Sequence, residues 1–178
     1  MLKYVFPIVV MIVSCSEEVP KQKAGFENKK SSRQMKLEYT SEINKEYSNS
    51  DYKSIQSYAK RYNLELTATG SGLQYQITKK TEGEQAKEEQ LATLGYSVSL
   101  LDGTQCYSSE EDGDSQVLID KDDVESGLHE AIKMLKVGEK GVFIIPYHSA
   151  HGLLGDDDKI PPLSVVVFRL ELKNLIGK

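Results

Sequence analysis

Residues 127–172 decide the fold of this 178-residue chain, and their sequence is GLHEAIKMLKVGEKGVFIIPYHSAHGLLGDDDKIPPLSVVVFRLEL. Apolar residues recur at helical spacing at first, and two short apolar runs follow, separated by a polar loop that ends in Pro161-Pro162. Short apolar runs bounded by Gly and Pro are typical of strands. The segment therefore predicts a helix, a strand over 141–147, a loop over 148–163 and a last strand over 164–175.

The helix at the start of this segment has one apolar face. Its apolar residues recur at i, i+4, i+7, i+8 and i+11, the spacing of a helix that packs one side against a core: Val124, Leu128, Ala131, Ile132 and Leu135. Asp122 or Asp123 is the expected N-cap, because a carboxylate accepts hydrogen bonds from the first turn and suits its positive end. Val137-Gly138 is expected to end the helix.

Strands are also expected before the helix. Leu73, Tyr75 and Ile77 alternate with polar residues, which is typical of a half-buried strand. Asp102-Gly103 between two candidate strands is a strong hairpin signal. Several antiparallel strands with one helix packed on them predict an α+β domain. The expected strands span 73–78, 91–101, 104–107 and 116–119, with an acidic loop at 110–115.

The composition fits a globular domain with a polar extension. Hydrophobic residues make up 39% of the chain and charged residues 28%, and the net charge is −5. No basic stripe lies on the part expected to fold, so nucleic acid is not an expected partner. Three acidic runs are expected to be solvated loops: 110–114, 120–123 and 156–158.

The first residues have the composition of an export signal. Met1-Leu2-Lys3 carries a positive charge, and the apolar run at 5–13 is far shorter than the roughly 20 residues that span a bilayer. Ile12-Val13-Ser14-Cys15 resembles a bacterial lipobox, whose cysteine carries lipid after cleavage; an ordinary signal peptide with a chance cysteine is the alternative. We expect a lipoprotein signal peptide at 1–14 and a lipid on Cys15 that anchors the protein to a membrane of the bacterial cell envelope, periplasmic or surface-exposed.

Residues 15–48 are polar and predict a disordered, lipid-anchored tether, because they bury too little apolar surface to offset their ordering entropy. A helical segment at 49–68 follows, with the helix itself at 51–62 and Asn63 as its C-cap. One face of this helix is expected to pack on the domain or on a second copy of the chain, with a partner surface as the alternative: Tyr52, Ile55, Tyr58, Ala59 and Tyr62. The oligomeric state stays open.

Together, these pieces in this order resemble the FKBP-type peptidyl-prolyl cis-trans isomerases. The resemblance covers about Thr69 to Ile176, and Gly95-Tyr96-Ser97 followed by Leu101-Asp102-Gly103 matches the family's tyrosine-then-hairpin segment. It implies an FKBP-type domain over 69–178, with a five- or six-stranded antiparallel sheet curled around one amphipathic helix. The layout of lipidated cysteine, tether, helix and domain resembles the gliding-motility-associated FKBP-type lipoproteins of Bacteroidetes.

The resemblance implies an enzyme that isomerises Xaa-Pro bonds of exported or envelope proteins and so assists their folding. Rotation about a peptide bond costs about 18–20 kcal/mol, and a prolyl bond interconverts unaided in tens to hundreds of seconds. An apolar cavity that excludes water and binds the twisted amide needs no cofactor or metal, and none is expected. The alternative is a catalytically weak or inactive FKBP-like module that binds proline-containing clients in an envelope machinery such as that of gliding motility.

The resemblance also implies a proline pocket built from seven positions of this chain. Its aromatic walls match Tyr96 and Phe168. Its aliphatic walls match Val124 and Ile160, and its floor matches Leu128.

Two further positions match groups that bind the substrate carbonyl. The backbone N–H of Glu125 matches the family's donor, a role that its side chain does not decide. His151 stands where the family usually has a loop tyrosine whose hydroxyl reaches the same carbonyl. An imidazole can also donate there, but its charge depends on pH.

The chain departs from the family at several pocket positions. The floor is usually tryptophan rather than Leu128, which implies a deeper or looser pocket. Cys106-Tyr107 replaces the family's Phe-Asp, so an aromatic wall and a carboxylate that faces the substrate amide are exchanged for a thiol and a phenol. Ser115 occupies a position that is often aromatic. These exchanges favour the alternative of weak or absent activity.

The cysteines and histidines suggest no second chemistry. With Cys15 lipidated, Cys106 has no disulfide partner, and a lone cysteine in a strand is usually a small buried apolar residue. His148 and His151 have a spacing that invites a metal interpretation, but two ligands on a loop make at best a weak site.

Overall fold

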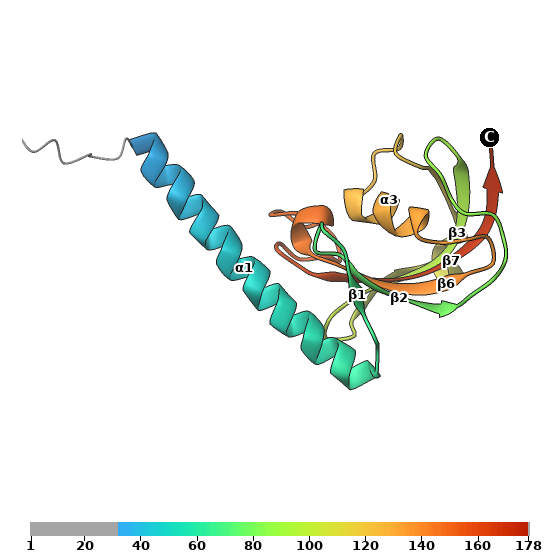
Figure 1. The fold of residues 1–178 in the computed structure, drawn as a ribbon, viewed down its shortest axis with the longest axis horizontal. Coiled ribbons are helices and arrows are strands. Elements are labelled where there is room, and N and C mark those ends of the chain that lie inside the picture. Colours follow the sequence, from blue (N-terminus) through green and yellow to red (C-terminus); the bar gives the residue numbers. More distant parts are fainter. Residues whose placement is uncertain (1–31, 178) are drawn as a thin grey trace, which may run out of the picture. The chain divides into compact units, whose positions relative to one another are not determined.

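The computed structural model describes the backbone of residues 32–177 and the side chains of residues 46–177 (Figure 1). The predicted signal peptide, Cys15 and the first part of the predicted tether lie outside the described residues. Residues Tyr39–Lys178 form one compact unit. Across the described part of the chain, every helix falls short of the length or the apolar character that a membrane span requires.

The first helix is longer than its sequence pattern predicts. α1 spans Ser32–Tyr62, which corrects both the expected start at Asp51 and the unstructured tether expected up to residue 48. The added turns are mostly polar, with four Ser among residues 32–50, which favoured the interpretation as a tether. They nevertheless contain an apolar repeat at helical spacing, which was overlooked: Met35, Tyr39, Ile43 and Tyr47. The expected C-cap is confirmed: Asn63 has φ 53° and the N–H of Leu64 donates to the carbonyl of Ala59 at 2.9 Å.

The described strands form one antiparallel sheet of seven. Its order is β1 (Thr67–Ala68), β2 (Gln74–Lys79), β6 (Lys140–Ile145), β7 (Val166–Ile176), β3 (Leu91–Leu100) and β4 (Gln105–Ser108), and β5 (Ser115–Leu118) also pairs with β3. The expected strands are confirmed within a few residues. The count exceeds the expected five or six because the two-residue β1, unseen in the sequence pattern, adds an edge to β2.

One helix packs on each face of this sheet. Along β6 and β7, apolar side chains alternate between two clusters: Phe143 and Phe168 belong to the larger one, Ile144 and Val167 to the smaller. Successive strand residues point to opposite faces, so the central strands are buried on both sides and their sequence is almost continuously apolar.

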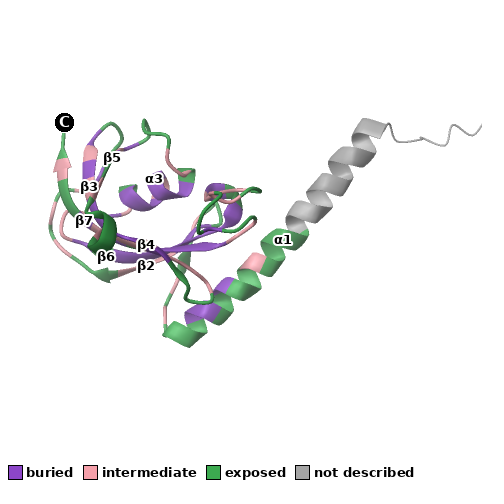
Figure 2. Cartoon of the chain, turned by 180° about the vertical axis from the view of Figure 1, so that it is seen from behind, coloured by how far each residue is buried: buried purple, intermediate pink, exposed green. Residues whose placement is uncertain are grey.

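The larger cluster lies under α3 (Ser126–Lys133). Figure 2 shows α3 buried along most of its length, and the expected apolar face is confirmed. Only glycine fits at 127, because a Cβ there would lie 2.4 Å from Ile145 Cγ2 and 2.8 Å from the carbonyl oxygen of Ser149. Close approach of the helix to β6 therefore depends on this residue.

The expected cap of α3 is wrong. The N-cap residue is Glu125, and its side chain makes no capping hydrogen bond. Asp122 instead accepts from the backbone N–H of Leu118 at 2.7 Å. Buried His129 fixes the same turn, because its Nδ1 accepts from Asp120 N at 3.0 Å and its Nε2 lies 3.1 Å from the Asp122 carbonyl oxygen.

The smaller cluster lies under α1. Ile55 and Tyr58 pack there against Val142, Ile144 and Val167. The prediction that this helix packs on the domain is confirmed for Ile55, Tyr58 and Ala59, which are buried. It is wrong for two tyrosines, which are 56% and 43% exposed: Tyr52 and Tyr62.

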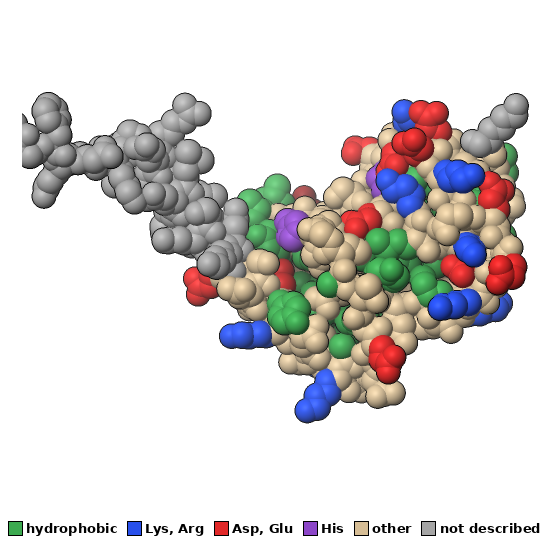
Figure 3. Space-filling view, viewed as in Figure 1, with side chains coloured by type: hydrophobic (Ala, Val, Ile, Leu, Met, Phe, Trp, Pro, Cys, Tyr) green, Lys and Arg blue, Asp and Glu red, His purple; other side chains and the backbone are tan. Residues whose placement is uncertain are grey.

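The surface carries charges of both signs. On the face shown in Figure 3, Lys and Arg alternate with Asp and Glu and leave apolar patches between them. The acidic loop expected at 110–115 instead contains a short helix, α2 (Ser109–Asp112), and β5 begins at Ser115 after Gly113 and Asp114. This correction matters because α2 contacts a candidate pocket residue.

Candidate proline pocket

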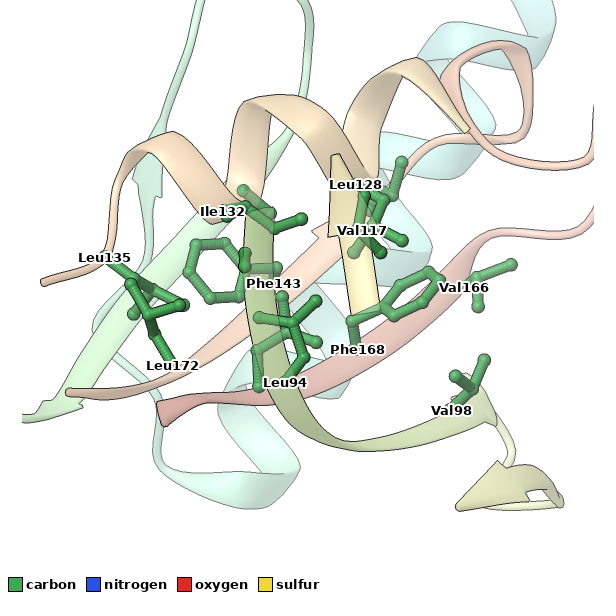
Figure 4. Close-up of a cluster of buried hydrophobic side chains, with 14 of the residues drawn as sticks. Leu94, Val98, Val117, Leu128, Ile132, Leu135, Phe143, Val166, Phe168 and Leu172 are labelled. Carbon is green, nitrogen blue, oxygen red and sulfur yellow. The ribbon is translucent and has the colours of Figure 1, made fainter. Parts of the chain in front are cut away.

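Five of the seven predicted site residues meet in the larger cluster. Leu128, Ile160 and Phe168 are buried, with 8%, 2% and 5% of their surface exposed. Tyr96 and Val124 are half-buried and pack against the same cluster. Figure 4 shows Leu128 and Phe168 among the side chains that fill the space between α3 and the sheet. The fold thus brings five residues that were predicted as walls and floor, from four separate segments, into or against one cluster.

Tyr96 is anchored by α2. It pairs with Leu170 across β3 and β7, and its N–H donates to Ser109 Oγ at 3.0 Å. Its hydroxyl donates to Asp112 Oδ2 at 3.4 Å. Partial burial, together with the adjacent Asp112 carboxylate, raises the pKa of Tyr96, so the phenol stays protonated and can act as a donor.

The other two predicted residues contact each other. His151 Nε2 lies 2.9 Å from Glu125 Oε1, and both side chains are about one-fifth exposed. The Glu125 carbonyl accepts from the N–H groups of Leu128 and His129. The N–H of Glu125 donates to no acceptor among residues 46–177, so it is available as a donor. A donor and an imidazole therefore lie directly beside Val124.

Side-chain contacts between β4 and the loop that leads to Ile160 were not predicted from the sequence. We call the residues that make these contacts the β4 clamp: Cys106, Tyr107, Asp156, Asp158 and Lys159. The Tyr107 hydroxyl donates to the carboxylate of Asp156 and, at 3.3 Å, to Asp158. The ammonium of Lys159 lies 4.7 Å from the centre of the Tyr107 ring, and Cys106 Sγ lies 3.6 Å from the Lys159 carbonyl oxygen.

Asp156 links this clamp to the pocket wall. Its Oδ1 accepts from the N–H groups of Ile160 at 2.7 Å and Asp158 at 3.0 Å. Burial opposes its ionisation, but these bonds, the Tyr107 hydroxyl and nearby His151 together lower its pKa to about 2. The same contact, with some burial, raises the pKa of Tyr107 well above its usual range. Asp156 is therefore a structural carboxylate, not the freely solvated one expected from its acidic run.

A tight turn makes this arrangement possible. Gly155 has φ +77°, and a Cβ there would lie 2.1 Å from the Ile160 carbonyl oxygen. An aspartate that accepts from N–H groups further along its own loop is a known turn device. In the sequence, Gly155-Asp156 indicates a turn, but it does not indicate that Asp156 contacts Tyr107 on β4.

The remaining candidate residues have ordinary surroundings. Cys106 is buried as expected, and burial raises the pKa of its thiol. His148 Nε2 lies 3.1 Å from the Ser71 carbonyl oxygen while His151 pairs with Glu125, so the two rings have separate partners. No group of three potential metal ligands occurs among the residues described. Ser115 pairs with Leu94 at the start of β5.

Taken as a whole, the candidate site is a set of apolar side chains in the larger cluster, with polar pairs around them that we call the rim. Each rim carboxylate is bonded to another rim side chain: Asp112, Glu125 and Asp156. The site therefore offers apolar contacts, and the backbone N–H of Glu125 follows directly after Val124 in the chain.

Comparison with known proteins points to one family. A model described as FKBP-type peptidyl-prolyl cis-trans isomerase matches residues 82–173, just over half of the chain. The chain is 38% identical over 107 residues to the probable FKBP-type peptidyl-prolyl cis-trans isomerase FkpA of Neisseria meningitidis serogroup B, covering 60% of this chain and 39% of that protein. It is 31% identical over 157 residues to FkpA of Escherichia coli K12, covering 88% of this chain and 56% of that protein.

The solved structures agree on the fold. The crystal structure of FkpA from Escherichia coli superposes with a TM-score of 0.62 at 24% identity, covering 83% of this chain and 74% of that one. The chain spans between 39% and 56% of the length of the two curated relatives.

Proposed function

The chain belongs to the FKBP-type peptidyl-prolyl cis-trans isomerase family, and on that premise we propose that it accelerates cis–trans isomerisation of Xaa-Pro bonds in exported polypeptides. The observation that carries the proposal is the cluster that contains Leu128, Ile160 and Phe168, with Val124 packed against it and the N–H of Glu125 next in the chain. It offers an apolar contact for a proline ring and a donor for the adjoining carbonyl.

The proposed mechanism is binding of a distorted substrate. Rotation about the prolyl bond breaks amide resonance, and the twisted transition state is less polar at the amide than the planar ground state. Water-excluding walls therefore favour the transition state over the ground state, which is the condition for acceleration. No step needs proton transfer, a covalent intermediate or a cofactor.

Each side chain has a distinct proposed role. Phe168 and Ile160 hold the two sides of the proline ring, and Leu128 forms the base of the proposed pocket. The N–H of Glu125 holds the carbonyl next to the rotating bond, and His151, oriented by the Glu125 carboxylate, reaches the same region.

A protease-coupled assay on short Xaa-Pro peptides tests the activity. In this assay the protease cleaves only the trans peptide, so the slow phase of cleavage reports cis-to-trans isomerisation, which takes tens to hundreds of seconds unaided. Micromolar concentrations of residues 16–178 should shorten this phase. A slow phase identical to that in buffer would contradict the proposed activity.

A binding module without turnover is the second candidate. Leu128 in place of the family's tryptophan and Tyr107 in place of its aspartate favour it. Fluorescence anisotropy with labelled proline peptides distinguishes the two candidates. A domain that binds the peptides through Phe168 but leaves the slow phase unchanged would support the second one.

We also propose that Cys15 carries lipid and that the protein acts at the cell envelope. The apolar run ending at Cys15 motivates this, and so does the polar segment behind it. Cys15→Ala should abolish labelling by a tagged fatty acid and release the protein from the membrane fraction. Unchanged labelling would contradict the anchor. A role in gliding motility rests on the shared layout alone, and normal gliding of a deletion strain would remove it.

A further inference from the structure

A cavity of about 290 Å³ lies beside α1, away from the proline pocket. Its lining comes from three places in the compact unit: the second half of α1, the turn before β2, and the residues just after β6. Polar and apolar groups contribute to it: Asp51, Tyr52, Ile55, Gln74, Pro146 and His148. None of the seven predicted proline-pocket residues lines it.

Asp51 is the unusual member of this lining. Its Oδ2 is buried and accepts no hydrogen bond from any group in the described part of the chain. Burial raises the pKa of this carboxyl, although the His148 imidazole nearby acts in the opposite direction. A buried acceptor without a donor is costly, so such groups in folded proteins normally have a partner.

The neighbouring polar groups already have partners. His148 Nε2 lies 3.1 Å from the Ser71 carbonyl oxygen. Gln74 Oε1 accepts from Gln56 Nε2 at 3.0 Å. Unlike these groups, Asp51 Oδ2 has no partner in the described part of the chain, and a positively charged donor matches it best.

The apolar part of the lining narrows the ligand further. Ile55 and Pro146 both line the cavity and contribute apolar groups, and Tyr52, a further lining residue, is 56% exposed. Lysine and arginine combine an apolar stem with a charged head, and an aromatic face attracts such a head. A volume just below the roughly 300–1,000 Å³ of small-molecule sites suits one side chain.

We propose that this cavity binds a basic side chain, lysine or arginine, of a polypeptide, with the charged head on the Asp51 carboxylate and the stem along Ile55 and Pro146. The site is separate from the proposed isomerase pocket and does not depend on turnover. It would give the protein a second point of recognition for cationic segments.

The test is a heteronuclear NMR titration of the full chain with N-acetyl-arginine methylamide. The matched control ligand is N-acetyl-citrulline methylamide, which has the same shape without the charge. The arginine compound should shift the signals of Gly72, Gln74 and His148 in a saturable way. The citrulline compound should bind about tenfold more weakly or worse, since a charge-assisted bond is lost.

Variants make the test specific. Asp51→Asn keeps the shape and should weaken arginine binding by about tenfold or more. Asp123→Asn removes an exposed carboxylate elsewhere and should leave binding unchanged. Tyr52→Leu alters an exposed residue and gives a second variant if the first folds poorly. Equal binding of the two ligands, an unaltered affinity in both cavity variants, or shifts confined to other regions would overturn the proposal.

Discussion

The walls and the rim of the proposed proline pocket are built in different ways. The walls are mostly buried side chains of α3, β7 and the end of one loop, and they share a core with the rest of the domain. The rim consists of polar pairs: Tyr96–Asp112, Tyr107–Asp156 and Glu125–His151. Tyr96 belongs to both, because its ring packs against the core and its hydroxyl donates to Asp112. Changing a wall therefore affects folding and function together, whereas changing the rim affects mainly the shape of the opening.

The largest effect is expected at a wall. Phe168→Ala removes a buried ring and should lower the free energy of unfolding by about 3–5 kcal/mol, because a cavity is left in the core. Urea unfolding followed by circular dichroism measures this. Tyr62→Ala, which truncates a half-exposed ring, is the matched control and should cost far less. Equal losses of unfolding free energy in the two variants would contradict the distinction between a buried wall and the surface.

The next effect concerns the support of the walls. Gly127→Ala places a methyl group within 2.4 Å of Ile145 and should cost about 1–3 kcal/mol through overpacking. Gly70→Ala is its control: no atom lies within 4 Å of the added group, and the change should stay within about 0.5 kcal/mol. The midpoint temperatures of thermal unfolding of the two variants measure this difference in stability. If Gly127→Ala is as stable as its control, α3 does not depend on this contact.

The β4 clamp should have a smaller effect. Tyr107→Phe removes a donor to Asp156 and should cost at most about 1 kcal/mol at neutral pH, because the pair is partly exposed. The pKa of Asp156 is about 2 when folded, below the roughly 3.9 of an unfolded chain. Its contribution is therefore complete above the unfolded value and disappears as the pH falls towards 2.

Urea midpoints of the chain and of Tyr107→Phe at several pH values test this. The gap between them should be widest near neutral pH and close as the solution is acidified towards pH 2. Tyr96→Phe, whose hydroxyl contact is longer at 3.4 Å, should show a narrower gap throughout. A gap that widens on acidification would contradict the assigned role of Asp156.

The smallest effect is expected at the Glu125–His151 pair. Glu125→Gln leaves the backbone N–H in place and removes only the carboxylate that orients the His151 imidazole. The value of kcat/KM on proline peptides should therefore fall about two- to fivefold, mainly through KM. Glu130→Gln, on the neighbouring α3, is the control. A complete loss of activity in Glu125→Gln would move the side chain from the rim to the centre of the mechanism.

The same division explains what the sequence could reveal. Leu128 and Phe168 lie in segments with a clear period, and the order of those segments carried the family resemblance, so their burial in the core was predictable. The early turns of α1 were missed because their polar composition favoured a tether, although Met35, Tyr39, Ile43 and Tyr47 recur at helical spacing.

The β4 clamp was unpredictable for another reason. Tyr107 and Asp156 are 49 residues apart, and each is unremarkable in its own segment. Their contact exists only after β4 and the long loop have been brought together by the fold. The predicted cap of α3 was wrong for a similar reason: Asp122 accepts from the N–H of Leu118, and the helix begins only at Ser126.

The central claim is that the proposed pocket formed by Leu128, Ile160 and Phe168 catalyses prolyl isomerisation, and exchange NMR on an Xaa-Pro peptide tests it most directly. We expect micromolar protein to produce cis–trans exchange far faster than the tens to hundreds of seconds of the free peptide. Phe168→Leu, which keeps the site apolar but removes the ring, should reduce that exchange rate severalfold while remaining folded. Exchange no faster than that of the peptide alone, or exchange unaffected by Phe168→Leu, would contradict the claim.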